Sequence, residues 1–361
     1  MSNNYLPTDY QAFIHTSRYA RWLENENRRE TWHETVSRYM NNVVVNKLST
    51  FSDVTQKTKA DWALLKIEQA ILNLSVMPSM RAMMTAGPAL DRDNTAGYNC
   101  SYLPVDDPKA FDEAMYILLC GTGVGFSVER QYIQNLPEVP ELSDSETTVV
   151  VKDSKEGWAK GLRQVLALLW AGEIPKWDVS QIRPAGARLK TFGGRASGPA
   201  PLIDLFNFSV NTFKAAAGRR LSSLECHDLM CYIGQIVVVG GVRRSAMISL
   251  SNLSDGRMRH AKSGNWWETA GHRALANNSV CYTEKPDSET FIREWLSLVE
   301  SKSGERGVFN RQACKALAIR NDRRDPNHEF GTNPCSEISL RPYQFCNLTE
   351  VVVRATDTLK D

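Results

Sequence analysis

One short stretch of the sequence places three chemically capable side chains two residues apart. Asn333, Cys335 and Glu337 alternate within Gly331-Thr-Asn-Pro-Cys-Ser-Glu-Ile-Ser-Leu340. Residues two apart point to the same side of an extended segment, so the three could face one pocket. A thiol, a carboxylate and an amide would there provide a radical or nucleophilic centre, a proton acceptor and an orienting hydrogen bond. The spacing alone leaves open a cysteine buried in an ordinary loop.

Cysteine is spread thinly along the rest of the chain, with eight cysteines in 361 residues. A secreted disulfide scaffold would be shorter and denser, and no CxxC pair is present to form a zinc knuckle, so no metal site is expected. Buried thiols that act as small apolar side chains are expected at Cys120, Cys226, Cys231, Cys281 and Cys314.

The composition is typical of a globular protein, with 42% hydrophobic residues, 23% charged residues and a net charge of +2. This small basic excess suits a phosphorylated substrate and does not call for nucleic acid. Apolar runs such as 233–239 are too short to span a bilayer, and the N-terminus lacks a signal-peptide pattern. We therefore expect a cytoplasmic protein with no membrane contact and no direct nucleic-acid binding.

Two kinds of pattern indicate the elements that must position these residues. Apolar residues recur at helical spacing over 8–45 and 57–74, which predicts an N-terminal helical region over residues 1–78. From Ser79 onward, short apolar runs alternate with helical stretches, as is typical of βα units and an α/β fold.

Three other stretches carry local expectations. Residues 134–148 are rich in Pro, Glu and Ser and predict a surface loop, whereas 351–353 reads as a core strand. The glycines of Gly121-Thr-Gly-Val-Gly lack the ending of a phosphate-binding P-loop. We interpret them as a tight helix-to-strand connection that needs unusual backbone angles.

Three cysteine contexts resemble those of one enzyme family. Asn-Pro-Cys-Ser-Glu-Ile around Cys335 resembles the finger-loop motif of ribonucleotide reductases, especially the adenosylcobalamin-dependent class. The class of ribonucleotide reductase with a separate radical subunit more often has leucine where this chain has Pro334. Cys346-Asn-Leu-Thr-Glu350 and Asn94-Thr-Ala-Gly-Tyr-Asn-Cys100 are similar to the family's second and first cysteine motifs. Further similar stretches follow in the family's order along nearly the whole chain.

The resemblance implies a thiyl-radical reduction of ribonucleotides to deoxyribonucleotides. Cys335 would become the thiyl and take the 3′ hydrogen, and Glu337 would accept the proton of the 3′-hydroxyl. Asn333 would hold the ribose hydroxyls. Cys100 and Cys346 would face the other side of the sugar, protonate the departing 2′-hydroxyl and supply two electrons, ending as a disulfide. The N-terminal helices resemble those of the type that reduces triphosphates.

The same resemblance implies a binding site for a deoxynucleotide effector. Asp153 and Ser154 open a predicted helix, where the simpler reading is an N-cap. In the family this position binds the ribose of the effector, and a flexible loop passes the effector's identity to the substrate base. The loop positions that match are Lys190, Gly193, Gly194, Arg195 and Ser197, and the residues expected to contact substrate are Ser79, Asn99 and Ser101.

The resemblance also implies an incomplete fold. Residues 79–361 would form the first half of a ten-stranded α/β barrel, with the effector region and a central finger loop, while the second half is absent. A second polypeptide would supply the C-terminal half-barrel and most of the adenosylcobalamin site, and a thioredoxin-type reductant would regenerate the thiols. The chain could be the product of a split gene, a fragment or a non-catalytic remnant, or part of a catalytic subunit of the class with a separate radical subunit.

Overall fold

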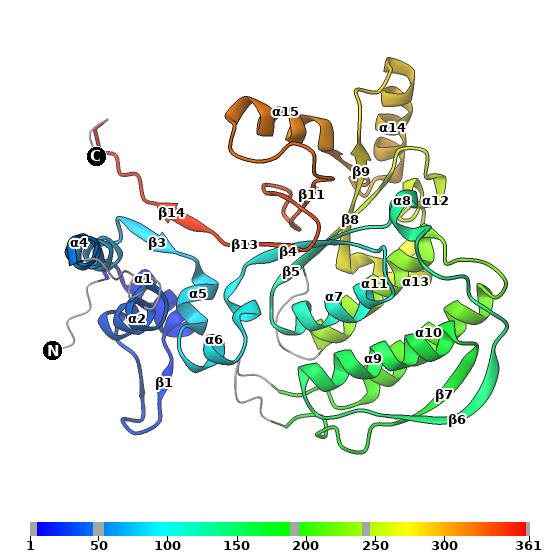
Figure 1. The fold of residues 1–361 in the computed structure, drawn as a ribbon, viewed down its shortest axis with the longest axis horizontal. Coiled ribbons are helices and arrows are strands. Elements are labelled where there is room, and N and C mark those ends of the chain that lie inside the picture. The colour runs from blue at the N-terminus through cyan, green and yellow to red at the C-terminus, as the bar shows by residue number, and fades with distance from the viewer. Residues whose placement is uncertain (1–5, 46–53, 188–194, 240–245, 359–361) are drawn as a thin grey trace. The chain divides into compact units, whose positions relative to one another are not determined.

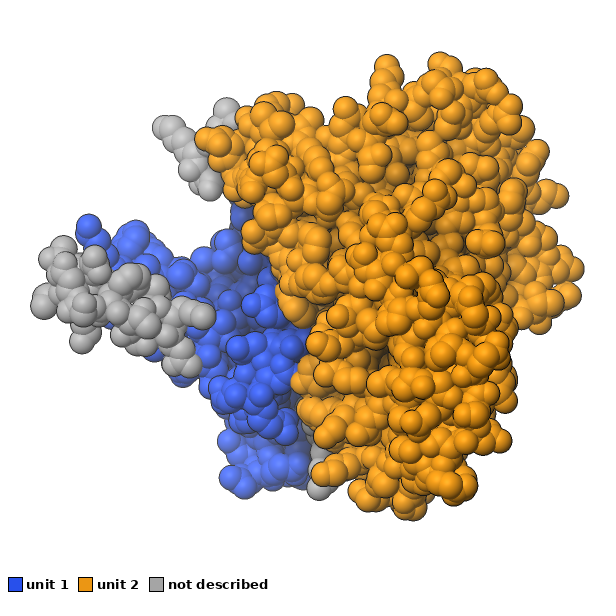
Figure 2. Space-filling view, turned by 45° about the vertical axis from the view of Figure 1, so that its right-hand side comes forward, with its two compact units in different colours: residues 1–99, 347–361 blue, residues 100–346 orange. Residues whose placement is uncertain are grey.

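A computed structural model describes residues 6–45, 54–187, 195–239 and 246–358 (Figure 1). The chain divides into two compact units, which Figure 2 shows in different colours. The first unit holds residues 1–99 and 347–361, and the second holds residues 100–346. The domain division expected at residue 78 stays a prediction.

The first unit is mainly helical, as the apolar spacing predicts. Thr31 and Glu34 form a reciprocal capping box at the start of α2, which places Trp32 in the unit's core with Val36 and Ile71. A short hairpin interrupts the predicted helical stretch 8–45. The elements are α1 (Asp9–Ile14), η1 (His15–Tyr19), β1 (Trp22–Leu23), β2 (Arg28–Arg29), α2 (Trp32–Tyr39), η2 (Met40–Val44), α4 (Val54–Leu72), α5 (Met80–Thr85), α6 (Pro88–Arg92) and η3 (Asn94–Gly97).

A two-stranded sheet joins distant parts of this unit. Strand β14 (Thr349–Val351) pairs antiparallel with β3 (Val76–Pro78). The expected core strand at 351–353 is wrong, because Val351 is 77% exposed and Val353 82% exposed. A two-stranded sheet leaves at least one face open, so its apolar side chains meet solvent.

The second unit is built on a six-stranded sheet, which confirms the expected α/β character (Figure 1). Neighbouring strands from β10 to β4 are parallel, whereas β13 runs antiparallel to β4. In spatial order the strands are β10 (Gly307–Asn310), β9 (Ala276–Tyr282), β8 (Met247–Asn252), β5 (Gly123–Ser127), β4 (Cys100–Pro104) and β13 (Gln344–Cys346).

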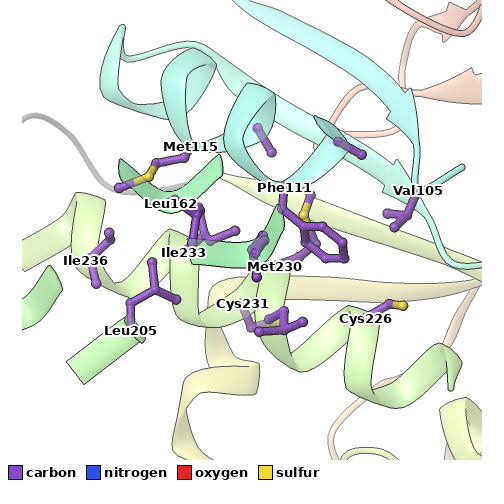
Figure 3. Close-up of a cluster of buried hydrophobic side chains, with 14 of the residues drawn as sticks. Val105, Phe111, Met115, Leu162, Leu205, Cys226, Met230, Cys231, Ile233 and Ile236 are labelled. Atoms are coloured by element: carbon purple, nitrogen blue, oxygen red, sulfur yellow. The ribbon is translucent and has the colours of Figure 1, made fainter. Parts of the chain in front are cut away.

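Helices α7 and α11 cover one face of this sheet, α9 and α10 pack against these two helices, and together the four enclose the main core. Phe111 of α7 and Met230 of α11 are fully buried there, and Figure 3 shows them beside Leu162 of α9 and Leu205 of α10. Strand β5 contributes Val124 to this core. The helices are α7 (Lys109–Leu119), α9 (Lys155–Trp170), α10 (Ala200–Ala215) and α11 (Ser223–Val239).

Smaller elements complete the second unit. Strand β6 (Ser143–Val150) pairs parallel with β7 (Glu173–Asp178), so the surface loop predicted over 134–148 is wrong from residue 143 onward. The remaining elements are α8 (Arg130–Ile133), α12 (Gly256–Arg259), α13 (Trp266–Thr269), η4 (Gly271–Leu275), α14 (Ser288–Ser301), α15 (Arg311–Asn321), β11 (Gly331–Thr332) and β12 (Ser339–Leu340).

The expected apolar thiols lie mostly inside this unit. Cys120, Cys226, Cys231 and Cys281 are buried, and Cys314 is half-buried. In the part of the chain that the structure describes, no helix combines the length and apolar character needed to cross a bilayer.

Candidate active site

Two cysteines from opposite ends of the second unit face each other across one strand pair. Strands β4 and β13 are antiparallel, and their register sets Cys346 directly opposite Cys100. Directly opposed residues in an antiparallel pair have Cα atoms about 4.5–5.5 Å apart, which lies inside the range that a disulfide can bridge. The strand pairing therefore places these two thiols within bonding reach.

The two thiols share a proton unequally. A hydrogen bond between their side chains, followed by burial, raises the pKa of Cys100 above its ordinary value. The same hydrogen bond lowers the pKa of Cys346, and the backbone N–H of Cys100 adds to this effect. A thiolate that accepts hydrogen bonds is favoured over the thiol. Cys100 is thus the proton-bearing partner, and Cys346 is the partner that ionises first.

Replacing Cys100 with alanine should raise the pKa of Cys346 towards its ordinary value, because the thiol that donates to it is lost. The thiolate is the reactive form, and each unit of pKa changes its fraction about tenfold below the pKa. The alkylation rate of Cys346 near neutral pH should therefore fall several-fold, measured by peptide mapping across a pH series. Cys226→Ala, at a buried thiol in the helical core, should leave that profile unchanged. An unshifted profile in Cys100→Ala would exclude the thiol–thiol hydrogen bond as the cause.

The Cys335 loop is a closed turn carried by a small hairpin. Strands β11 and β12 are antiparallel, and Asn333 closes the turn between them. Its Oδ1 accepts from the Ile338 N–H at 3.0 Å, and its own N–H donates to the Ile338 carbonyl at 3.3 Å. Ser336 adopts a left-handed φ of 68° at the tip. The extended segment expected from the spacing is therefore wrong, since Asn333 is buried while Cys335 and Glu337 are exposed.

Two glycines of β5 let this loop approach the sheet. A methyl group on Gly123 would lie 3.0 Å from Pro334 Cγ and 3.2 Å from Cys100 Sγ. On Gly125 it would lie 1.8 Å from the Thr332 carbonyl oxygen. Gly123 and Gly125 lie inside strand β5. The prediction that the glycines of Gly121-Thr-Gly-Val-Gly all belong to a helix-to-strand connection is therefore wrong. Of the three glycines in that motif, Gly121 alone has a positive φ, of 80°.

The loop side chains act on the cysteine pair. After the thiol–thiol hydrogen bond and burial, the Asn333 amide favours the Cys100 thiolate and the Glu337 carboxylate disfavours it. Glu337 and Cys335 likewise oppose ionisation of Cys346. The Asn333 Nδ2 is buried and has no partner in hydrogen-bond geometry within the described chain, although it lies near enough to Cys100 to favour the thiolate. A buried amide without a partner is a donor ready for a ligand oxygen.

The expected substrate-contacting residues are distributed over both units. In the first unit, Ser79 donates to Asn99 Oδ1 at 2.6 Å and also caps α5. In the second unit, Ser101 is buried and donates to the Gly123 carbonyl at 3.1 Å. Strand alternation turns Ser101 to the face opposite Cys100. Contact of these three residues with substrate stays a prediction.

Of the expected effector residues, Asp153 and Ser154 lie at the start of α9. Asp153 forms an ion pair with Arg183 at 2.8 Å, and Ser154 accepts from the Gly157 N–H as the N-cap. Arg195 donates to the Gly186 carbonyl at 2.9 Å, so the end of the predicted effector loop returns to the segment after Arg183. Ser197 donates to the adjacent Gly198 carbonyl. Lys190, Gly193 and Gly194 lie outside the described residues.

Sequence reasoning did not single out Arg183, which pairs with Asp153 of the predicted effector site. Its charge was visible within Arg183-Pro-Ala-Gly-Ala-Arg-Leu-Lys190, just before the predicted effector loop. The pairing with Asp153 was not visible, because 30 residues separate the two.

Known proteins match both units. The family "B12-dependent ribonucleotide reductase, insertion domain" matches residues 127–213, and the "Ribonucleotide reductase alpha domain" matches residues 2–88. An adenosylcobalamin-dependent ribonucleoside-triphosphate reductase of Lacticaseibacillus paracasei is 30% identical over 92% of the chain. One of Lactobacillus helveticus is 27% identical over the same share. A crystal structure of a B12-dependent (class II) ribonucleotide reductase matches 94% of the chain with a TM-score of 0.79 and 26% identity.

The chain is similar to the adenosylcobalamin-dependent ribonucleotide reductases. The resemblance of the chain to this family is confirmed by these matches. The alternative, a class with a separate radical subunit, is not favoured, since both reductases named above depend on adenosylcobalamin.

The chain spans about half the length of the reductases it matches. It covers 53% of the Lacticaseibacillus and Lactobacillus enzymes and 55% of the crystallised class II chain.

Proposed function

We propose that this chain is the thiol-bearing part of an enzyme that reduces ribonucleoside triphosphates to deoxyribonucleotides. The observation that carries the proposal is the register of β4 and β13, which sets Cys100 opposite Cys346. The loop that carries Cys335 packs through Pro334 against Gly123 of β5, the strand next to β4, beside Cys100 Sγ. Two thiols able to form a disulfide, beside a third on a separate loop, are what a two-electron reduction started by a thiyl radical requires.

The chemistry begins at Cys335. Its thiyl takes the 3′ hydrogen atom from the ribose and becomes a thiol again, while Glu337 accepts the proton of the 3′-hydroxyl. Asn333 holds a ribose hydroxyl through its buried, unpartnered Nδ2. Cys335 is exposed and is therefore open both to a ribose and to a radical source.

The reducing step uses the cysteine pair. Cys100, the proton-bearing thiol, protonates the departing 2′-hydroxyl, which leaves as water. Cys100 and Cys346 then supply two electrons to the sugar and become a disulfide, while the second thiol hydrogen goes to C2′ and the proton held by Glu337 returns to the 3′ oxygen. The hydrogen atom returns from Cys335 to C3′, which regenerates the thiyl. A thioredoxin-type reductant then reduces the disulfide.

Adenosylcobalamin is the cofactor of this proposal. When bound, it supplies the radical that removes the hydrogen atom from the Cys335 thiol. The exposed thiol at the tip of its loop fits such a source. A second polypeptide would provide the remaining half of the barrel, most of the binding site for adenosylcobalamin and the residues that bind the substrate phosphates. A fragment or a non-catalytic remnant is the competing reading.

The effector site belongs to the same proposal. Asp153 would accept a ribose hydroxyl of a deoxynucleotide, and Arg183 beside it would attract the phosphates. The loop that ends at Arg195 would pass the effector's identity to the substrate base.

Asp153→Asn and Ser154→Ala should separate effector binding from helix capping. Asp153→Asn should weaken binding of a fluorescent deoxynucleotide about tenfold, or about 1.4 kcal/mol, because a charged acceptor is lost. It should scarcely change the free energy of unfolding, because the Asp153–Arg183 pair is partly exposed. Ser154→Ala should instead lower the free energy of unfolding by about 1 kcal/mol through the lost cap. Equal binding by wild type and Asp153→Asn would remove Asp153 from the effector site.

Reconstitution tests the proposal directly. The chain is combined with the C-terminal half of the Lacticaseibacillus paracasei reductase and assayed for deoxyribonucleotide formation with a dithiol reductant. Activity should require both polypeptides, a ribonucleoside triphosphate and adenosylcobalamin. Activity without adenosylcobalamin would refute the cobalamin class. Inactivity in every combination, with both polypeptides folded and associated, would favour the remnant.

A further inference from the structure

A buried ion pair holds the base of the Cys335 loop, and the proposed chemistry does not use it. Arg311 is the first residue of α15, and Glu129 directly precedes α8. The guanidinium donates to both carboxylate oxygens of Glu129, at 3.0 and 2.6 Å. Its Nε donates to the Phe330 carbonyl at 2.7 Å. Phe330 immediately precedes β11, so one side chain joins the sheet to the start of the loop.

The Glu129 carboxylate is itself held from two further sides. Ser127, the last residue of β5, donates to it at 2.8 Å, and Gln131 donates at 2.9 Å. Arg311 is 1% exposed and Glu129 is 0% exposed. Burial alone would lower the pKa of Arg311, but the hydrogen bonds to Glu129 outweigh burial and raise it. Arg311 therefore stays charged, and the hydrogen bonds fix both side chains in position.

A continuous set of contacts leads from this pair to the catalytic thiols. Gly331 packs on the ring of Tyr102, so closely that a methyl group there would lie 2.1 Å from ring atoms. The Thr332 carbonyl lies over Gly125. Pro334 then meets Gly123, beside Cys100 Sγ. Four residues after the carbonyl that Arg311 holds, the loop thus packs beside one of the paired thiols.

Stability alone does not explain the pair. Desolvating two charges costs about as much as their attraction returns, and apolar side chains of similar volume often stabilise as well or better. Apolar side chains could not hold the Phe330 carbonyl in one direction, whereas the planar fork of arginine can. The charged pair therefore serves to fix the position of the Phe330 carbonyl, to which Arg311 donates.

We propose that Arg311 and Glu129 are positioning residues, which set where the Cys335 loop lies against the Cys100–Cys346 pair. The anchoring follows from contacts within the second unit. Only its catalytic meaning rests on the proposed function, so the test uses readouts on the full chain that need no turnover.

The test replaces both charges together, so that neither is left buried alone. Arg311→Met with Glu129→Gln is compared with Arg306→Met and Glu294→Gln. Arg306 and Glu294 form a second buried pair in the same unit, 2.6 Å apart. Arg306 holds the carbonyls of Asn252 and Leu253, which lie away from the Cys335 loop in the sequence. The control thus matches burial and chemistry but not the anchored segment.

Two measurements report on the loop. The first is hydrogen exchange of the amides of Asn333 and Ile338, which close the turn. The Arg311/Glu129 variant should speed their exchange at least tenfold relative to the Arg306/Glu294 variant. The second is the equilibrium of the Cys100–Cys346 disulfide with glutathione. It should change several-fold in the first variant only, because the loop that packs beside Cys100 Sγ through Pro334 is no longer held in position. A tenfold shift would correspond to about 30 mV.

Arg311→Lys supplies a milder variant if the double replacement does not fold. Lysine keeps the charge beside Glu129 but cannot match the arginine fork that also reaches Phe330. It should therefore keep most of the thermal stability while the Asn333 and Ile338 amides still exchange faster. Slow exchange in Arg311→Lys, or equal exchange and equal disulfide equilibria in the two double variants, would overturn the proposal. Loss of activity in the reconstituted enzyme with unchanged loop readouts would also count against it.

Discussion

Replacing Cys335 with serine should abolish deoxyribonucleotide formation by the reconstituted enzyme. A hydroxyl O–H bond is much stronger than a thiol S–H bond, so serine cannot carry the radical that takes the 3′ hydrogen. Removing one member of a set of groups that act together typically costs several orders of magnitude in rate. Because Cys335 is exposed, the substitution should scarcely change the free energy of unfolding. Product formation and urea unfolding of the same preparations measure the two effects.

A second thiol of the same unit provides the control for Cys335→Ser. Cys314 is half-buried in α15 and has no place in the proposed chemistry. Cys314→Ser should retain most of the activity, and both variants should still form the Cys100–Cys346 disulfide on mild oxidation. Substantial activity in Cys335→Ser would show that hydrogen transfer does not pass through this sulfur.

Replacing Gly125 with alanine should destabilise the second unit by about 3 kcal/mol or more, the upper end for overpacking. The added methyl would lie 1.8 Å from the Thr332 carbonyl oxygen and 3.3 Å from Ile248 Cγ2. The carbonyl oxygen and carbon of Thr332, 1.8 and 3.0 Å from the added methyl, are backbone atoms and cannot rotate away. Strand β5 and the Cys335 loop would have to separate. Urea unfolding would report the lost stability, and exchange of the Ile338 amide would report the displaced loop.

Gly256→Ala is the matched control for this overpacking. A methyl group at Gly256 meets nothing within 4 Å, and the residue needs no left-handed backbone angle. Its stability should stay within about 0.5 kcal/mol of the wild type, as for most surface changes. If Gly125→Ala were equally well tolerated, the loop could not lie against β5 as described.

Local patterns in the sequence predicted the type of most elements but not their partners. Helical spacing correctly indicated the helix over residues 57–74, which the structure describes as α4 (Val54–Leu72). The Pro, Glu and Ser content of 134–148 hid strand β6, whose stability comes from pairing with β7. Val351 looked like a core residue, yet burial depends on what covers a strand, and β3 covers only its edge.

The candidate site was predictable in its residue types and not in its geometry. Resemblance selected Cys100, Cys335 and Cys346 from eight cysteines, which spacing could not do. Strand β13 pairs antiparallel with β4 although the two are far apart in the sequence, and no local pattern predicts such a pairing. For the same reason no local pattern indicated the pairing of Glu129 with Arg311, since 182 residues separate them. The spacing of 333–337 predicted an extended loop, and side-chain bonding by Asn333 made it a turn.

The pairing of β13 with β4 also bears on how the protein is made. Cys100 leaves the ribosome about 250 residues before Cys346, a delay of about 12–50 s at about 5–20 residues per second. Until β13 arrives, the edge of β4 is an open template for other strands. Thiol–disulfide exchange runs over seconds to hours, so a nascent Cys100 has time to meet the wrong sulfur. Translation under reducing conditions would keep this thiol available for the partner that is made last.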